Sequence, residues 1–217
     1  MIYLQRKIWL CGGFDLFAKK NLNLRWIWFI CKGNYKFTEV NILIIRQERP
    51  EDYDTVYHVV KEAFENAEYT DGNEQNLVAA LRKSKSFIPE FSLVAIEDEK
   101  IVGHILFTKA VVQGVEVLAL APLSVLPDYQ NRGIGLSLMK EGHSIAHKLG
   151  YEYSVVLGHS KYYPKAGYIP ASECGIKAPF EVDDESFMAL NLNGSQNKLN
   201  GVIEYDKAFG IWCKKLE

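Results

Sequence analysis

The stretch from Val115 to Gly150 constrains the fold more than any other part of this chain. It holds a nearly all-apolar run, then a polar turn, then a segment of helical periodicity that opens on Gly133-Ile134-Gly135. The first N–H groups of a helix have no partner inside the helix and carry the positive end of its dipole. An apolar strand, a glycine-containing turn and a helix in this order therefore predict a site for an anion such as a phosphate.

Two common phosphate-binding motifs do not fit this turn. A Walker loop requires a Lys-Ser or Lys-Thr pair after its glycines, and no such pair follows the glycines here. A dinucleotide fingerprint requires a third small residue where Leu138 stands, and an acidic residue at the end of the next strand, which is absent near Leu157. The pattern that remains is Q-x-x-G-x-G, from Gln130 to Gly135.

This hexapeptide resembles the pyrophosphate-binding turn of the GNAT superfamily of N-acetyltransferases. A second stretch, Leu157 to Tyr168, is similar to that family's other signature, with a Tyr-x-Lys-x-Gly-aromatic pattern that begins at Tyr163. The likeness runs from about Asn41 to the C-terminus, and in its second half it is closest to the YhbS-like branch of predicted acetyltransferases. We therefore divide the chain into an N-terminal extension outside the resemblance, residues 1–40, and a GNAT acetyltransferase domain, residues 41–217.

The resemblance implies an α/β fold: a mixed, mostly antiparallel, twisted sheet of about six to seven strands, flanked by helices, with splayed central parallel strands. The residues agree with it. The strand that begins at Val115 is apolar on both faces, so we expect it to be central and covered on each side. Pro122 cannot donate a hydrogen bond, so we expect its ladder to open near Ala121 to Val125, with a plain bulge as the alternative.

The resemblance also implies acetyl-CoA as the co-substrate, with its pyrophosphate on the turn and its pantetheine arm along the open strand. Most contacts would come from the main chain, and the Arg132 side chain would be a further phosphate partner. The expected cofactor-binding residues are Leu123, Ser124, Val125, Gln130, Asn131, Arg132, Gly133, Ile134, Gly135, Leu136 and Ser137.

Three residues of the second signature are candidates for catalysis. Tyr163 matches the family tyrosine that protonates the departing thiolate, and Tyr162 is the second choice. His159 is a candidate base or oxyanion partner. In each case plain packing or surface hydrogen bonding is the alternative. The general base is left open, because Glu116 is the only carboxylate on the central strand and lies far from the opening.

The function we expect is direct transfer of an acetyl group from acetyl-CoA to the primary amine of a small molecule or peptide. A non-catalytic acyl-CoA sensor or interaction module of the same fold is the main alternative, and a nicotinamide-dependent oxidoreductase is a distant third. The formal net charge of −2 is spread evenly along the chain, so we expect neither a nucleic-acid nor a membrane partner. A homodimer stays open, and no metal site is expected.

The four cysteines are scattered, without paired spacing, which favours reduced thiols and a cytoplasmic location. In the extension, the apolar runs Ile8–Cys11 and Trp26–Cys31 are shorter than the roughly 20 residues that cross a bilayer. We expect the extension to pack on the domain or to be poorly ordered, with an interfacial membrane anchor as the alternative.

Periodicity predicts the remaining elements. Helices are expected over residues 50–64 and 74–83, strands at 42–46, 91–96, 101–112 and 153–157, and a closing hairpin from 187–192 and 201–205. In the helix after the glycine turn, an apolar stripe ending at Ile145 and Leu149 should pack on the sheet, with Gly142 allowing close approach. His143 and His147 are expected on its solvent face.

Overall fold

The structure is a computed structural model of the chain. It describes residues 42–67, 70, 72–194 and 198–210 in full, and only the backbone of three N-terminal strands, Ile2–Leu4, Trp26–Cys31 and Asn34–Glu39.

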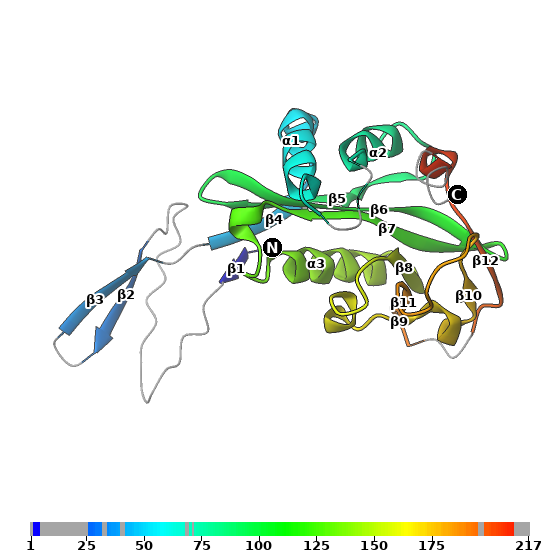
Figure 1. The fold of residues 1–217 in the computed structure, drawn as a ribbon. Helices are drawn as coiled ribbons and strands as arrows, with labels where there is room; N and C mark the ends of the chain where they lie inside the picture. The colour runs from blue at the N-terminus through cyan, green and yellow to red at the C-terminus, as the bar shows by residue number, and fades with distance from the viewer. Residues whose placement is uncertain are drawn as a thin grey trace.

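A mixed, mostly antiparallel sheet forms the centre of the fold (Figure 1). Its main path runs β1-β4-β5-β6-β7-β8-β11-β9, while β10 and β12 join through the edge of β6. The strands are β1 (Ile2–Leu4), β4 (Ile42–Gln47), β5 (Phe87–Glu97), β6 (Lys100–Val112), β7 (Val115–Val125), β8 (Tyr153–Leu157), β9 (Ile169–Pro170), β10 (Ile176–Lys177), β11 (Phe187–Asn191) and β12 (Gly201–Glu204). The expected fold class is confirmed, since the longer strands form the expected sheet and β1, β9, β10 and β12 extend it.

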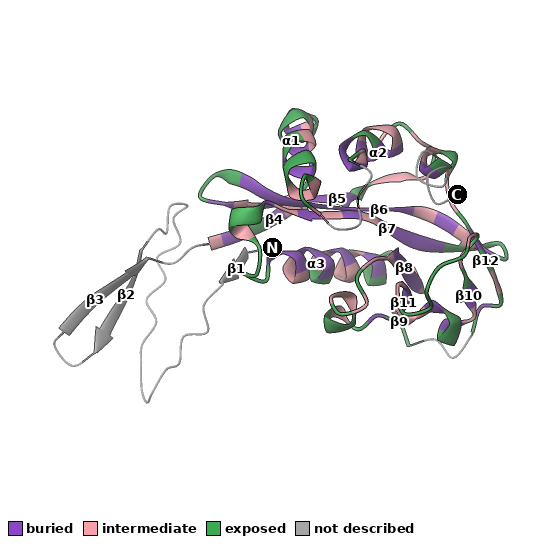
Figure 2. Ribbon diagram, in the orientation of Figure 1, coloured by how far each residue is buried: buried purple, intermediate pink, exposed green. Residues whose placement is uncertain are grey.

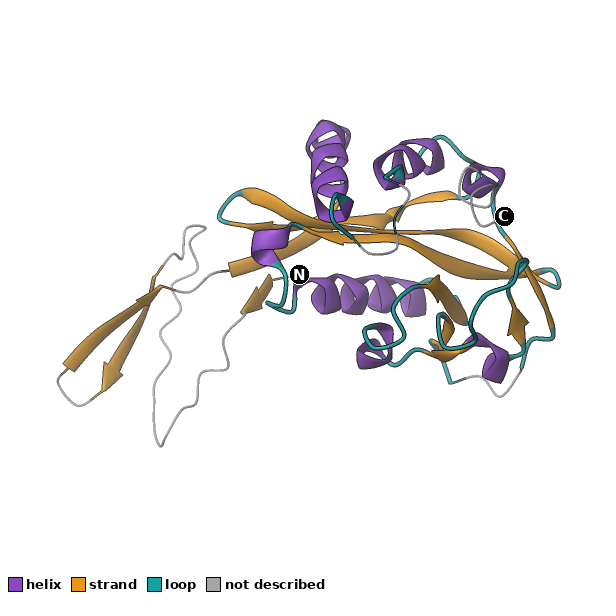
Figure 3. Cartoon of the chain, in the orientation of Figure 1, coloured by secondary structure: helices purple, strands orange, loops and turns teal. Residues whose placement is uncertain are grey.

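Helices cover both faces of this sheet (Figure 3). Helices α1 (Tyr53–Phe64) and α2 (Glu74–Leu81) pack on one face, and α3 (Ile134–Lys148) packs on the other. Short 3-10 turns complete the chain: η1 (Pro50–Asp52), η2 (Pro127–Tyr129), η3 (Tyr163–Ala166), η4 (Ala171–Cys174) and η5 (Lys207–Phe209). The expected helices 50–64 and 74–83 are confirmed to within a turn at their ends.

Strand β7 is buried at the middle of the sheet, as its apolar sequence predicted. Val117, Leu118, Ala119 and Leu120 are all buried, and Figure 2 shows burial concentrated where the sheet meets the helices. On β6, the ring of Phe107 would lie 2.3 Å from a Cβ at Gly142 of α3. This confirms that Gly142 lets the helix come close to the sheet.

Three local expectations were wrong. His143 is partly buried, because the segment after η3 folds back over α3 and Tyr168 Oη lies 3.0 Å from its Nε2. Leu149 is 53% exposed, because the helix ends at Lys148 and the chain turns away. Strands β11 and β12 form no hairpin: β11 pairs with β8 and β9, whereas Ile203 of β12 pairs with Val112 of β6.

Part of the N-terminal extension joins the sheet. Strand β1 pairs antiparallel with β4, while β2 (Trp26–Cys31) and β3 (Asn34–Glu39) pair with each other. The run Ile8–Cys11 lies outside the described residues. Across the described residues, no helix has the length and apolar character needed to cross a membrane.

Candidate active site

The centre of the candidate site is a gap between β7 and β8. These strands pair in parallel from Leu118 to Leu120, and β7 then continues to Val125 without β8 beside it. The register between β6 and β7 shifts at the same place, between Ile105 and Phe107, next to a cis peptide bond before Pro122. The opening expected near Ala121 to Val125 is therefore confirmed. Backbone groups on the β8 side of this segment are left without a strand partner among the described residues.

The first turn of α3 faces the end of that gap. Gly133 is its N-cap with φ 82°, in the left-handed region that glycine adopts without strain. Its first intrahelical hydrogen bond runs from Ser137 N to Gly133 O, so the N–H groups of Ile134, Gly135 and Leu136 have no acceptor within the helix. Gly133 has no side chain to cap them, and this turn has no acidic residue. The geometry suits an anion.

Side chains of the turn before α3 hold that turn in place and leave the first N–H groups of α3 uncovered. Gln130 Nε2 donates to Val125 O at 3.1 Å, which ties the turn to the end of β7. The guanidinium of Arg132 donates to Asp128 O at 2.5 Å and lies 4.9 Å from the centroid of the Tyr129 ring. Its Nη1 is 4.0 Å from the buried Glu97 carboxylate. Arg132 is thus held beside the turn with its side chain half exposed.

Tyr162 brings a hydroxyl to the first turn of α3. A Cβ at Gly135 would lie 2.2 Å from Tyr162 Oη and 3.5 Å from Leu123 Cδ2. Three predicted site residues, one each from β7, α3 and the segment before η3, therefore meet at one point. Burial raises the pKa of the Tyr162 phenol above its usual value, because the phenolate would lose hydration.

Tyr163 lies at the other end of the gap. Its ring would be 2.3 Å from a Cβ at Gly158, so Gly158 makes room for it. Gly158 follows Val156, the partner of Leu120, by two residues, which places the Tyr163 ring just beyond the last β7–β8 pair, where the gap begins. Burial, with a smaller effect from Tyr162, raises the pKa of Tyr163 well above its usual value. Its hydroxyl stays protonated at neutral pH and can donate a proton.

The other predicted site residues are less directly placed. His159 is exposed, and its carbonyl accepts a hydrogen bond from Tyr162 N at 3.0 Å. The Ser124 hydroxyl donates to His104 O at 3.2 Å, so it points toward β6. Glu116 is exposed at the start of β7 and bonded to Lys109 Nζ at 3.1 Å. It does not reach the gap, which starts after Leu120.

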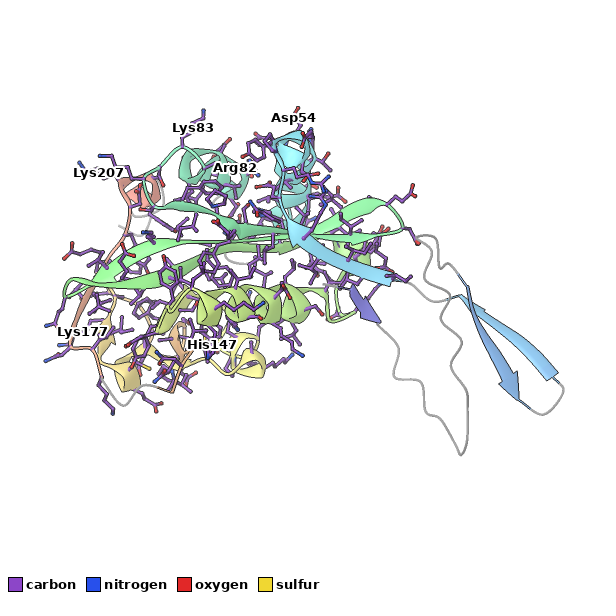
Figure 4. All side chains as sticks on the ribbon, turned by 180° about the vertical axis from the view of Figure 1, so that it is seen from behind. Asp54, Arg82, Lys83, His147, Lys177 and Lys207 are labelled. Carbon is purple, nitrogen blue, oxygen red and sulfur yellow. The ribbon has the colours of Figure 1, made fainter. Side chains whose placement is uncertain are left out.

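Sequence reasoning missed a buried polar network beneath α1 and α2. Glu48 pairs with Arg82, at the end of α2, and accepts a hydrogen bond from Ser92 Oγ at 2.6 Å. The Ser92 hydroxyl donates its proton to Glu48, so its oxygen accepts a hydrogen bond from His104 Nε2, 3.1 Å away. The other ring nitrogen, Nδ1, is then a buried acceptor with no hydrogen-bond partner within the described chain. Burial and the Arg82 charge lower the pKa of His104 to about 3. Figure 4 shows Arg82 turned toward the strands and Lys83 turned outward.

No signal in the sequence pointed to this network, since its members come from four separate segments of the chain. Only His104, a histidine between Gly103 and Ile105 in an apolar run, stands out in retrospect. The described residues contain no group of three or more His, Cys, Asp or Glu side chains that could hold a metal ion.

Sequence comparisons agree with this geometry. The model of the family described as "Acetyltransferase (GNAT) family" matches residues 53–168. Among curated proteins, the uncharacterized N-acetyltransferase YjhQ of Escherichia coli K12 is 38% identical over 138 residues, which are 60% of this chain and 76% of YjhQ. The uncharacterized N-acetyltransferase YhbS of the same strain is 28% identical over 171 residues, 77% of this chain and 98% of YhbS.

Two solved structures share the fold. Crystalline YhbS from Escherichia coli in complex with CoA superposes with a TM-score of 0.70 at 26% identity, over 77% of this chain and 92% of that one. A GNAT family acetyltransferase from Brucella melitensis in complex with acetyl-CoA superposes with a TM-score of 0.65 at 32% identity, over 77% and 97%.

Proposed function

Because this chain belongs to the acetyltransferase (GNAT) family, we propose that it moves the acetyl group of acetyl-CoA directly onto a primary amine. The observation that carries the proposal is the meeting of the β7–β8 gap with the uncapped first turn of α3. The open strand edge can pair with the two amides of the pantetheine arm of CoA, and the helix N-terminus in line with it can bind the pyrophosphate. The CoA and acetyl-CoA bound in the two related crystal structures support this choice of cofactor.

In this arrangement the pyrophosphate accepts hydrogen bonds from the N–H groups of Ile134, Gly135 and Leu136. Arg132 can leave the Asp128 carbonyl to pair with a phosphate oxygen, since its side chain is half exposed. The pantetheine amides pair with the open edge of β7 near Leu123 and Val125, as an added strand would. The thioester then lies toward Leu120, at the level of Tyr163.

The chemistry follows from that placement. The amine attacks the thioester carbonyl, a backbone N–H at the opening of β7 stabilises the oxyanion, and Tyr163 protonates the departing thiolate. Holding both reactants in attack geometry can supply up to roughly 10 kcal/mol of the barrier reduction. Cys174, the cysteine whose surroundings the structure describes, is buried in η4 with its thiol pKa raised by burial. It is poorly suited to carry an acetyl group, which favours direct transfer.

One observation favours the alternative of a non-catalytic acyl-CoA-binding module. The only carboxylate on β7, Glu116, is exposed and pairs with Lys109 away from the gap. A module of that kind would bind acetyl-CoA without acetylating any amine.

A thiol-release assay distinguishes the two functions. Purified protein is mixed with acetyl-CoA and a panel of primary amines, free CoA thiol is followed, and acetylated products are identified by mass spectrometry. We expect thiol release that requires an amine and is lost in Gly135→Glu, whose carboxylate would oppose the pyrophosphate. Tight acetyl-CoA binding without amine-dependent thiol release would establish the binding module instead.

A further inference from the structure

One carboxylate occupies a position where the helix pattern calls for an apolar residue. Glu74 opens α2 and lies one turn before Leu77 and two turns before Leu81, on the stripe that packs against the rest of the domain. All three side chains are 0% exposed. Burying a carboxylate costs several kcal/mol unless its charge and its lone pairs are satisfied, so a residue in this place needs a reason.

The hydrogen bonds of Glu74 satisfy only half of the carboxylate. Oε1 accepts from Thr70 Oγ1 at 2.5 Å, and that hydroxyl oxygen accepts in turn from Gly72 N at 2.9 Å. Oε2 is buried and has no hydrogen-bond partner in the described part of the chain. The carboxylate is therefore held in one orientation, and among the described residues its second oxygen has room for a further donor.

Helix α2 packs on the face of the sheet that includes β7. It contacts β7, the strand whose ladder with β8 ends at Leu120. Along β6, Gly103 and Phe107 face α3, so the alternate residues His104 and Thr108 face α1 and α2. Thr108 pairs with Ala119 of β7, next to the gap, and its buried Oγ1 also has no partner among the residues described. With His104 Nδ1, three unsatisfied polar atoms face this one layer.

We infer that Glu74 is the carboxylate that receives the ammonium group of the acceptor, and that the acceptor is a cationic aliphatic amine. The inference rests on the proposed acetyl transfer and supplies the base that β7 lacks. Aliphatic amines titrate near the lysine value of about 10.4, so they reach the enzyme as ammonium ions that cannot attack. A buried carboxylate binds such a cation through a charge-assisted hydrogen bond and accepts its proton.

The ammonium gives one proton to Glu74 Oε2, and the neutral nitrogen then forms the C–N bond to the acetyl carbon. The C–S bond then breaks as Tyr163 gives its phenolic proton to the CoA sulfur, and the second proton of the nitrogen restores the Tyr163 hydroxyl. Glu74 afterwards returns its proton to solvent. The products are an N-alkylacetamide, CoA thiol and one proton.

The test uses two isomeric amines, 2-phenylethylamine and 4-ethylaniline. The first is an aliphatic ammonium ion at neutral pH, and the second is an uncharged aromatic amine of the same composition. The parent protein, Glu74→Gln and a control, Glu62→Gln, are compared; Glu62 is an exposed carboxylate on α1. Acetyl-CoA affinity is measured by calorimetry and kcat/KM by thiol release.

The parent and Glu62→Gln should acetylate 2-phenylethylamine in preference to 4-ethylaniline. Glu74→Gln should lower kcat/KM for 2-phenylethylamine by about 10- to 100-fold, the value of a hydrogen bond to a charged group, with acetyl-CoA affinity unchanged. The loss should shrink as pH approaches 10, where the free amine is abundant. A Glu74→Gln enzyme with unchanged kcat/KM, or a parent that prefers 4-ethylaniline, would overturn the assignment.

If the Glu74→Gln variant fails to fold, a second measurement on the parent protein tests the assignment. On the parent–CoA complex, 2-phenylethylamine should raise the Tm and 4-ethylaniline should not; no difference between them would count against Glu74. If the parent does not bind acetyl-CoA at all, the proposed function fails first. If it binds acetyl-CoA and acetylates neither amine, only the acceptor class and the role of Glu74 fail.

Discussion

The hydroxyl of Tyr162 lies directly over the backbone of Gly135, so that a Cβ on residue 135 would come within 2.2 Å of Tyr162 Oη. The contact joins the segment before η3 to the helix turn proposed to hold the pyrophosphate. Alanine at position 135 must therefore displace either Tyr162 or the first turn of α3.

We expect Gly135→Ala to weaken acetyl-CoA binding about 10-fold, since overpacking of this kind costs about 1–3 kcal/mol. Adding Tyr162→Phe removes the oxygen atom that clashes and should restore most of the affinity. Gly142→Ala is the control, because its Cβ would meet Phe107, two turns farther along the same face of the helix and away from Tyr162. Calorimetry should find Gly142→Ala less stable yet unchanged in affinity. Equal affinity losses for both alanine variants would refute a specific role for the Gly135 contact.

Tyr163 is expected to act on the chemical step rather than on binding. Tyr163→Phe should lower kcat by about 100-fold while the acetyl-CoA dissociation constant changes less than about two-fold, because only the proton donor is lost. Tyr162→Phe should affect kcat much less. Steady-state kinetics with calorimetry separates the two, and a larger kcat effect for Tyr162→Phe would exchange their roles.

The raised pKa of Tyr163 also sets the alkaline side of the pH profile. Its phenol must be protonated to donate, and burial keeps it protonated beyond the ordinary tyrosine range. We therefore expect kcat to rise with pH as the amine loses its proton, with no falling limb below about pH 10. A fall in kcat between pH 8 and pH 9 in the stable parent enzyme would argue against Tyr163 as the acid.

The buried pair of Arg82 and Glu48 should matter for stability. Their side chains are 8% and 1% exposed, so Arg82→Met leaves an uncompensated buried carboxylate and should cost about 3–5 kcal/mol of unfolding free energy. Lys109→Met, which breaks the exposed pair with Glu116, should cost about 1 kcal/mol or less. Urea denaturation measures both; similar small losses would show that water already reaches the Arg82 pair.

His104 should make the protein sensitive to mild acid. Burial and Arg82 lower its folded pKa to about 3, below the usual 6.5, so the unfolded chain binds the proton more readily. Stability is then full above about pH 6.5 and falls as pH drops, by up to roughly 1.4 kcal/mol per pH unit for this residue. His143, with a pKa lowered to about 4 by burial, adds in the same direction.

His104→Gln should therefore flatten the loss of stability between pH 6.5 and pH 5, because the glutamine amide can still donate to Ser92 but does not titrate. His147→Gln, at an exposed position on α3, is the matched control and should leave the slope unchanged. Urea denaturation at three pH values within this window gives the slope; equal slopes for the parent and His104→Gln would contradict the burial argument.

Features set by local sequence were predictable, and those set by distant contacts were not. The glycine turn, α3 and the opening at Pro122 follow from residues close together in the chain, because helix termini and proline impose their geometry on immediate neighbours. Strand β12 was wrongly expected beside β11, since its pairing with β6 depends on a contact about ninety residues away.

The same distinction holds within the site. Tyr162, Leu123 and Gly135 could be proposed together only because a family resemblance supplied contacts that spacing alone does not. Glu48 and His104 could not be linked from the sequence, because the sheet brings them together. Glu74 did not stand out in the sequence, because acidic residues are common at the exposed starts of helices. Only its burial in the structure shows it to be unusual.

The measurement that tests the central claim most directly is a calorimetric titration of the protein with acetyl-CoA, repeated on Gly135→Glu. We predict micromolar binding by the parent, and loss of binding in the variant, which keeps its fold by circular dichroism but places a carboxylate against the first turn of α3. No binding by the parent, or equal binding by both proteins, would contradict the claim that this turn and the gap beside it hold the cofactor.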